Sequence, residues 1–317
     1  MASRPIHVIE FWHYLAGKKP EEIAVHIEPR KIITLSDDYP NLEHILLDVP
    51  EGIPGDVDAT WQSALEANPQ MTNNLKPVIR TISDDGTRYS AAMSSYKNSL
   101  WMKKRLSQYS EQIQQQIADI LAFFNIGLVT MTSDGFVLLE QRPENVTAGG
   151  MLLNYPCGYL TATDTTLADP VNAQCIGELG FPAYVNGMLD PRIQCINSLG
   201  MQRESDEWTP NLVFLMKLNI PFAEVRPTKE TKKIIGWPYD EIVERTANAY
   251  SPTIKGAVSG KLVPNAIAML ALAVRHISGE RAYQTLCCRL SQAAHVKGYN
   301  LIEREYAPST NPFKQSS

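Results

Sequence analysis

The sequence predicts an α/β fold. Short segments rich in β-branched and apolar residues, typical of strands, are interspersed with longer segments whose apolar residues repeat at helical spacing. Pro, Gly and Asp residues separate most of these segments. The chain has 317 residues, of which 44% are hydrophobic and 20% charged. It is therefore long enough for two domains and has the composition of an ordinary globular protein.

The N-terminal part, residues 1–115, is predicted to be an α+β region and contains no motif that assigns its role. The strands expected in this region span residues 5–12, 23–27, 31–35 and 43–49. A helix should follow through Trp61, with Asp56 or Asp58 as its N-cap and the break at Asn68-Pro69 as its end.

Residues 78–92 predict a hairpin with its turn at Asp85-Gly86, a pair that tolerates positive φ. The next segment, residues 95–124, contains few helix breakers and predicts a long helix, broken near residues 107–110. The polar run SQYSEQIQQQ within it is either the solvated face of that helix or a linker between two domains.

The second half predicts a domain over residues 116–300, followed by a tail over residues 301–317. Its expected elements are a hairpin over 127–141, a strand over 211–218, and helices over 265–277 and 280–295. Arg203 and Glu204 are expected in a solvent-exposed connection ahead of the second of these elements. The chain from Ala307 onward is expected to be loosely ordered.

Charge and cysteine content exclude several classes of protein. The formal net charge of -5 argues against a surface that tracks nucleic acid throughout. The five cysteines form no C-x-x-C pair and indicate neither a disulfide framework nor a zinc site, which favours a reducing, cytoplasmic location. No apolar run approaches the roughly 18 residues of a membrane span, so no membrane partner is expected.

The stretch from Asn125 to Phe181 carries most of the chemical information. A turn at Pro156-Cys157-Gly158 precedes a predicted helix of about ten residues. Asp169 is the expected N-cap of this helix, Pro170 its first residue and Gly180 the residue that ends it. Within the helix, Gln174 and Glu178 are one turn apart and share a face.

This arrangement resembles the box of the Nudix hydrolase family, G-x5-E-x7-R-E-U-x-E-E-x-G-U, in which U is a bulky aliphatic residue. The strand sequence VLLEQR before the box and the segment beginning at Trp237 after it also resemble the family, over about residues 120–290. The resemblance implies a Nudix-like α/β/α sandwich with a mixed β-sheet. Several box side chains depart from the pattern, because Ala173, Gln174 and Gly177 stand where the family has Arg, Glu and Glu.

The resemblance also implies the site residues. Nudix hydrolases hold Mg²⁺ or Mn²⁺ through helix carboxylates and activate water with a carboxylate. Gln174 and Glu178 would be the catalytic positions here, although an amide is a feeble base. The implied metal ligands are Glu178, the Cys157 carbonyl oxygen, Asp164 and Glu230, and the implied substrate-binding residues are Arg142 and Gly158. Two of these have a structural alternative, because Glu230 lies in a charged loop and Arg142 could pair with a box carboxylate.

Two functions stay open from the sequence. The first is a divergent Nudix-like hydrolase that cleaves a nucleoside diphosphate-linked substrate with the help of a divalent cation. The alternative is a degenerate Nudix-fold module that binds a nucleotide-like ligand, RNA or a protein partner, or a scaffold that runs another biosynthetic reaction. The expected partner is a small nucleotide-like molecule, and the sequence does not determine the oligomeric state.

Overall fold

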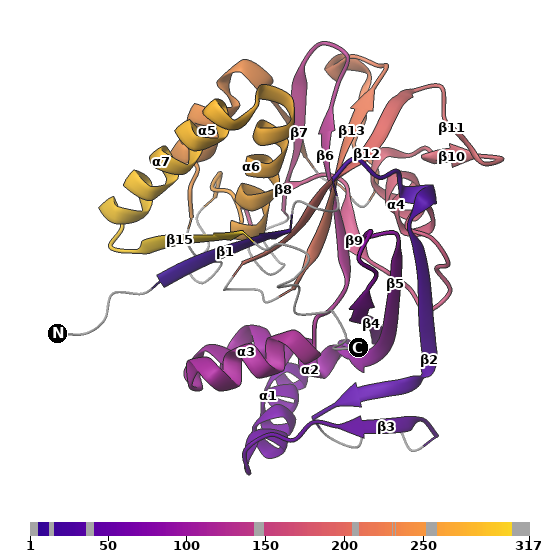
Figure 1. The fold of residues 1–317 in the computed structure, drawn as a ribbon, viewed down its shortest axis with the longest axis vertical. Helices are drawn as coiled ribbons and strands as arrows, with labels where there is room; N and C mark the ends of the chain where they lie inside the picture. Colours follow the sequence, from indigo (N-terminus) through magenta and orange to yellow (C-terminus); the bar gives the residue numbers. More distant parts are fainter. Residues whose placement is uncertain are drawn as a thin grey trace.

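A computed structural model describes residues 6–12, 16–35, 41–142, 149–204, 209–229, 231, 233–251 and 259–305. Its largest feature is a nine-stranded mixed sheet with helices on both faces, and a four-stranded sheet with three further helices lies below it in Figure 1. The α/β fold with a mixed sheet is therefore confirmed.

The nine-stranded sheet contains strands from both ends of the chain. Seven strands follow one another across it: β14 (Ile234–Pro238), β7 (Phe136–Gln141), β6 (Asn125–Met131), β13 (Asn211–Leu218), β12 (Ile193–Glu204), β1 (Ile6–Trp12) and β15 (Asn300–Glu305). The β13–β6 and β1–β15 pairs are parallel, and the other pairs are antiparallel.

Two short strands complete this sheet where β6 and β7 diverge. Near their connecting turn, β6 and β7 pair through Met131 and Val137. Farther along, β8 (Leu152–Asn154) pairs with the end of β7, and β9 (Cys157–Tyr159) pairs with the start of β6. Residues 152–159, which include Cys157 and Gly158, are thus inserted into the middle of the sheet.

Each face of this sheet has its own hydrophobic core. One face is covered by α5 (Ile242–Asn248), α6 (Pro264–Ser278) and α7 (Glu280–Val296). A Cβ on Gly127 would lie 2.3 Å from the Met269 side chain, so the absence of a side chain lets α6 approach β6 closely. The opposite face packs against α4 (Ala168–Gln174), whose Val171 shares a core with Leu128 and Phe214.

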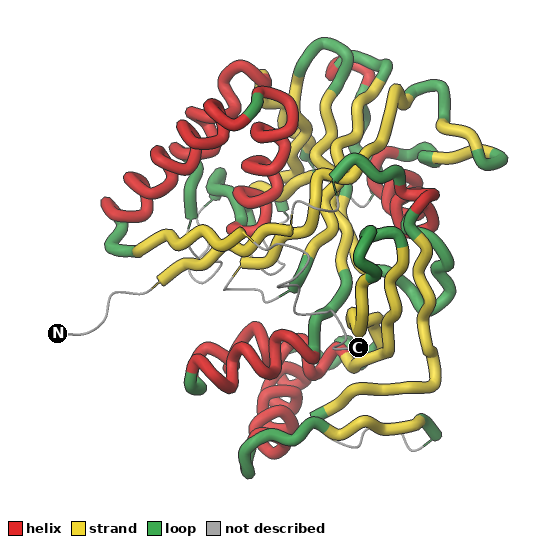
Figure 2. The backbone as a smooth tube through the Cα atoms, in the orientation of Figure 1, coloured by secondary structure: helices red, strands yellow, loops and turns green. Residues whose placement is uncertain are grey.

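The four-stranded sheet and its helices form a third core. Its strands follow the order β3 (Glu43–Leu46), β2 (Ala24–Thr34), β5 (Arg88–Ser95) and β4 (Leu75–Ile82). Its helices are α1 (Ile53–Ala67), α2 (Tyr96–Arg105) and α3 (Glu111–Ile120), which Figure 2 shows gathered next to this sheet. The remaining short elements are a hairpin of β10 (Tyr184–Val185) and β11 (Met188–Leu189) and the 3-10 turns 20–22, 106–108, 222–224 and 239–241.

Several predicted elements are confirmed, and others need correction. The expected break in the segment 95–124 is confirmed, because α2 ends at Arg105 and α3 begins at Glu111. The segments 23–27 and 31–35 are one strand, β2. Gly52, at φ 95°, is the N-cap of α1 in place of Asp56 or Asp58. Asp56 instead accepts a hydrogen bond of 2.8 Å from Trp101 Nε1, and Asp58 forms an ion pair with Lys97. The chain from Ala307 lies outside the described residues, and the domain boundaries at 115 and 300 stay predictions.

Cysteine and membrane features can be compared with their predictions. Within the described residues, none of the five cysteines forms a disulfide bond. Among the described residues, none of the helices is both long enough and apolar enough to cross a membrane. The cytoplasmic location stays a prediction.

Arg203 is a buried ion-pairing residue, so its predicted place in an exposed connection is wrong. It lies on β12 and is 1% exposed. Its Nε donates to Glu10 Oε2 at 2.8 Å, and its Nη1 donates to Asp119 Oδ1 at 3.0 Å. Because Glu10 is on β1 and Asp119 is on α3, one guanidinium ties three elements together.

Removing this guanidinium should be costly. We expect Arg203→Ala to lower the free energy of unfolding by about 3 kcal/mol, because the buried Glu10 would lose its closest ion pair and keep the exposed Arg304, 3.7 Å away, as a weaker one. The matched control is Arg245→Ala, whose partner Glu241 is exposed, so its cost should stay below about 1 kcal/mol. Urea unfolding of both variants measures the difference, and equal costs would show that the buried network does not stabilise the fold.

Candidate functional site

The helix of the box consists of two parts. The α-helical part begins at Ala168, and a π-helical turn over 175–179 follows before Gly180 ends the helix at φ 77°. The predicted end at Gly180 is therefore confirmed, because glycine adopts this left-handed conformation without strain. The predicted N-cap is wrong. Asp169 lies inside the first turn, and its carboxylate accepts hydrogen bonds from the backbone N–H groups of Thr165 and Thr166 at 2.8 and 3.0 Å.

Gln174 lies at the centre of the site. Its hydrogen-bonding neighbours orient the amide so that Nε2 donates to the Cys157 carbonyl oxygen at 2.8 Å and to Glu178 Oε1 at 3.2 Å. The structure thus brings together three of the predicted site residues, from β9 and from both parts of the helix. Two hydrogen bonds from one amide nitrogen thus join β9 to the Glu178 side chain of the helix.

Gly158 makes this close approach possible. A Cβ built on Gly158 would lie 2.4 Å from Cδ of Gln174 and 2.4 and 2.6 Å from its two terminal amide atoms. Side chains do not approach a Cβ atom so closely, so the Gln174 amide uses the space that any larger residue at position 158 would fill. The role of Gly158 visible in the structure is to admit a protein side chain.

Tyr155 binds the last turn of the helix through its hydroxyl group. Its side chain is fully buried, and its hydroxyl donates to the backbone carbonyl oxygen of Glu178. Burial raises the pKa of this hydroxyl, and the nearby charges of Glu178 and Glu140 raise it further. Tyr155 is therefore a neutral hydrogen-bond donor that fixes the position of Glu178.

Glu140 is a second carboxylate near the box that the sequence analysis did not single out. It is half-buried on β7 and lies close enough to affect the pKa of Tyr155. Burial raises the pKa of Glu140, and the guanidinium of Arg142 partly opposes this shift. The signal was present in the VLLEQR strand, but sequence alone does not show which strand side chains approach the helix.

The remaining predicted site residues have other surroundings. Both carboxylate oxygens of Asp164 accept hydrogen bonds from Thr161, from its backbone N–H at 2.7 Å and from its hydroxyl at 2.9 Å. Arg142 follows β7, where it lies beside Glu140. Glu230 lies outside the described residues, although Thr228, two residues earlier, donates to the carbonyl oxygen of Gly177 at 2.7 Å. The loop after residue 225 therefore reaches the box helix.

These surroundings do not fit a standard divalent-cation site. Mg²⁺ prefers hard oxygen ligands, and proteins usually supply them as one or more carboxylates with room for water and phosphate oxygens. In the described part of the chain, no group of three His, Cys, Asp or Glu side chains could hold a metal ion. Two of the candidate ligands, the Cys157 carbonyl oxygen and Glu178 Oε1, already accept hydrogen bonds from Gln174.

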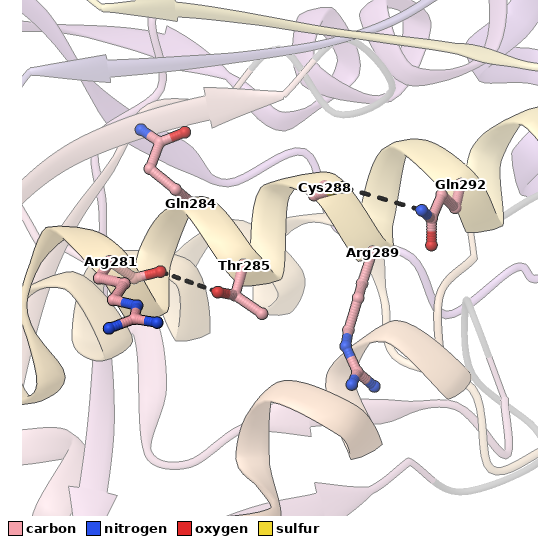
Figure 3. A pocket seen from close by; sticks show the side chains of 6 residues that line it. All are labelled: Arg281, Gln284, Thr285, Cys288, Arg289 and Gln292. Carbon is pink, nitrogen blue, oxygen red and sulfur yellow. Dashed lines mark hydrogen bonds between the residues drawn. The ribbon is translucent and has the colours of Figure 1, made fainter.

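A separate hollow lies along α7, which covers the other face of the large sheet. It has a volume of ≈ 660 Å³ and is lined by Arg281, Gln284, Thr285, Cys288, Arg289 and Gln292 (Figure 3). All six side chains are exposed and come from one helix. This hollow is therefore distinct from the box, and its arginines supply a control for the experiments below.

Comparisons with known proteins give a limited likeness. No family model and no curated protein matches the chain. Among solved structures, the chain is similar to a Nudix hydrolase from M. smegmatis, RenU, at 14% identity over 50% of this chain and 86% of that chain, with a TM-score of 0.33. It is also similar to the MutT protein from Methanosarcina mazei Go1, at 15% identity over 49% of this chain and 94% of that chain, with a TM-score of 0.32. At these values the likeness does not establish an activity.

The packing at Gly158 leads to a prediction about stability. We expect Gly158→Ala to cost about 1 kcal/mol, because the new methyl group would push the flexible end of Gln174 aside and break its hydrogen bonds to the Cys157 carbonyl oxygen and Glu178. The matched control is Gly55→Ala in α1, where nothing lies within 4 Å of the added Cβ, and alanine there should stabilise by up to about 1 kcal/mol. In the double variant Gly158→Ala/Gln174→Ala, the added methyl group should carry no such cost, because the amide is absent. Thermal or urea unfolding measures all three, and a neutral Gly158→Ala would contradict the predicted overlap.

The environment of Glu140 leads to a prediction about pH. Its pKa is raised in the folded protein, so the folded state holds this proton more tightly than the unfolded chain does. Stability is therefore lost as pH rises from the unfolded pKa through the raised folded pKa. We expect Glu140→Gln to increase stability at neutral pH and to have little effect at a pH below both pKa values. Unfolding curves between pH 3 and 8 test this, and a difference independent of pH would contradict it.

Proposed function

We propose that the chain is a Nudix-like protein that binds a nucleoside diphosphate-linked small molecule at the box and cleaves it slowly or not at all. The observation that carries this proposal is the loss of carboxylates from the box helix. Of the three positions where the family has Glu, the helix keeps a carboxylate at Glu178 alone, and that carboxylate accepts a hydrogen bond from Gln174.

The chemistry of these residues supports binding over cleavage. Hydrolysis of a diphosphate with a divalent cation requires ligands for the cation and a base for the attacking water. Of the three box positions 174, 177 and 178, only Glu178 carries a carboxylate, because Gln174 is an amide and Gly177 has no side chain. The carboxylate of Asp169, in the first turn of the helix, accepts hydrogen bonds from the backbone of Thr165 and Thr166. An amide does not accept a proton near neutral pH, so Gln174 cannot act as the base.

The elements around the box support a phosphate-containing ligand. Arg142 is a fixed cation at the end of β7, and a guanidinium can bind phosphate oxygens through two parallel hydrogen bonds. The net charge of -5 disfavours binding along a nucleic-acid backbone and leaves a small molecule as the better candidate. The identification of this molecule with a nucleotide derivative rests on the resemblance of the box to the family.

A divalent-cation-dependent hydrolase is the second candidate, and one observation favours it. Glu140 supplies a second carboxylate near the helix, and the charges of Glu140 and Glu178 both raise the pKa of the Tyr155 hydroxyl. In this alternative, Glu178 and the Cys157 carbonyl oxygen would hold Mg²⁺ or Mn²⁺ after the Gln174 amide turned away. Glu140 would then be the candidate base.

A ligand panel distinguishes the two functions. The purified protein is incubated with nucleotide sugars, dinucleotides and capped RNA, in EDTA and in Mn²⁺, and both thermal shift and phosphate-bond cleavage are measured. We expect a thermal shift with a nucleotide derivative in EDTA and little cleavage. We expect Arg142→Ala to weaken binding by about tenfold or more, since a charged hydrogen bond contributes about 1.5–3 kcal/mol. Arg281→Ala, on the outer surface of α7, is the control and should bind normally.

The other outcomes are equally informative. Mn²⁺-dependent cleavage that is lost in Glu178→Ala would establish the hydrolase. A response to capped RNA alone would replace the small molecule by RNA. A complete absence of thermal shift and cleavage across the panel would show that the box does not bind nucleotide derivatives.

A further inference from the structure

We propose that the side-chain amide of Gln174 takes the place of a divalent cation in this box, so that the site is closed without a metal. This inference rests on the assignment of the box made in the proposed function, but it does not depend on any ligand. In this role Gln174 neither binds a metal nor takes part in catalysis, but occupies the place of the cation.

The first argument is the hydrogen bonding of the amide nitrogen. A carboxamide nitrogen carries two N–H groups, and the nitrogen of Gln174 has two oxygen acceptors, the Cys157 carbonyl oxygen at 2.8 Å and Glu178 Oε1 at 3.2 Å. A cation between the same two oxygens would bind both as ligands. The amide nitrogen therefore satisfies the two oxygens that a cation would otherwise join.

The second argument is the space over Gly158, and it does not depend on hydrogen bonding. The Gln174 carboxamide lies where a Cβ of residue 158 would be, with Cδ at 2.4 Å and the two terminal amide atoms at 2.4 and 2.6 Å. The backbone at Gly158 and the side chain of Gln174 thus fit together as a pair. The space next to the Cys157 carbonyl oxygen is filled by the Gln174 amide, so a hydrated ion could enter there only if this side chain moved.

The third argument is electrostatic. A cation would neutralise Glu178, whereas the amide only donates a hydrogen bond to it, so the box keeps a negative charge. For a cation to enter, both amide hydrogen bonds would have to break, and Mg²⁺ would also have to lose part of its tightly held water shell. With one carboxylate in return, binding should be weak.

Replacing the NH₂ group of Gln174 by an oxygen should raise the affinity of the box for a divalent cation. In Gln174→Glu, an oxygen replaces the NH₂ group with little change in shape. This oxygen would face the Cys157 carbonyl oxygen and Glu178 Oε1 with no proton between them, and two neighbouring carboxylates repel each other. A divalent cation would relieve the repulsion, so the variant should gain a cation site that the natural chain lacks.

The test measures Mn²⁺ binding by the EPR signal of the free ion and by thermal shift, with no nucleotide present. We expect Gln174→Glu to bind Mn²⁺ at least about tenfold more tightly than the natural chain and to be stabilised by it. Without the cation, Gln174→Glu should be less stable than the natural chain at pH 8. The matched control Gln174→Ala should lose stability as well, because the bridge is gone, but should gain no affinity for Mn²⁺.

Three results would overturn the inference. In the first, the natural chain binds Mn²⁺ as tightly as Gln174→Glu does, which would mean that the ion displaces the Gln174 amide. Another is a Gln174→Ala variant as stable as the natural chain. The third is a Gln174→Glu chain that stays unfolded when Mn²⁺ is present. Because the test contains no nucleotide, a failure of the ligand panel would refute the proposed function and leave this inference intact.

Discussion

The divergence of β6 and β7 is the constraint on which the site depends. The two strands pair near their turn, through Met131 and Val137, and then separate enough for β8 and β9 to pair with them. This insertion gives the chain from 152 to 159 a fixed backbone position in the middle of a sheet. The Cys157 carbonyl oxygen and Gly158 therefore present a rigid surface to the helix that follows.

The helix is held against that surface by contacts at its polar end as well as by its core. Val171 and Cys175 are buried in the core between helix and sheet, while Tyr155 and Thr228 donate to the carbonyl oxygens of Glu178 and Gly177. These carbonyl groups belong to the π-helical turn, where the usual helical hydrogen bonds are rearranged. Side-chain donors thus compensate for the irregular turn, and they fix the carboxylate of Glu178 near Gln174 without a metal.

The sequence predicted those parts of the structure that depend on local chemistry. Gly180 ends the helix because of its backbone freedom, and the break before Glu111 follows from local polarity. The sequence pattern did not predict contacts between segments that are far apart along the chain. The burial of Arg203 depends on carboxylates about 84 and 193 residues away, and the approach of Glu140 to the box depends on how far β6 and β7 diverge. Spacing also placed Gln174 and Glu178 on one face, but only the structure shows that the Gln174 amide nitrogen joins Glu178 to the Cys157 carbonyl oxygen.

The charges around the box limit what it can bind without a metal. A diphosphate that approaches Glu178 and Glu140 meets two carboxylates, and a divalent cation normally screens such repulsion. If the Gln174 amide takes the place of the cation, the screening has to come from elsewhere. Two features can supply it: Arg142 offers a positive charge beside Glu140, and burial raises the pKa of Glu140, which favours its neutral form. A metal-free box of this kind should therefore bind a ligand of lower charge more readily than a nucleoside triphosphate, because each additional phosphate adds repulsion that one arginine does not offset.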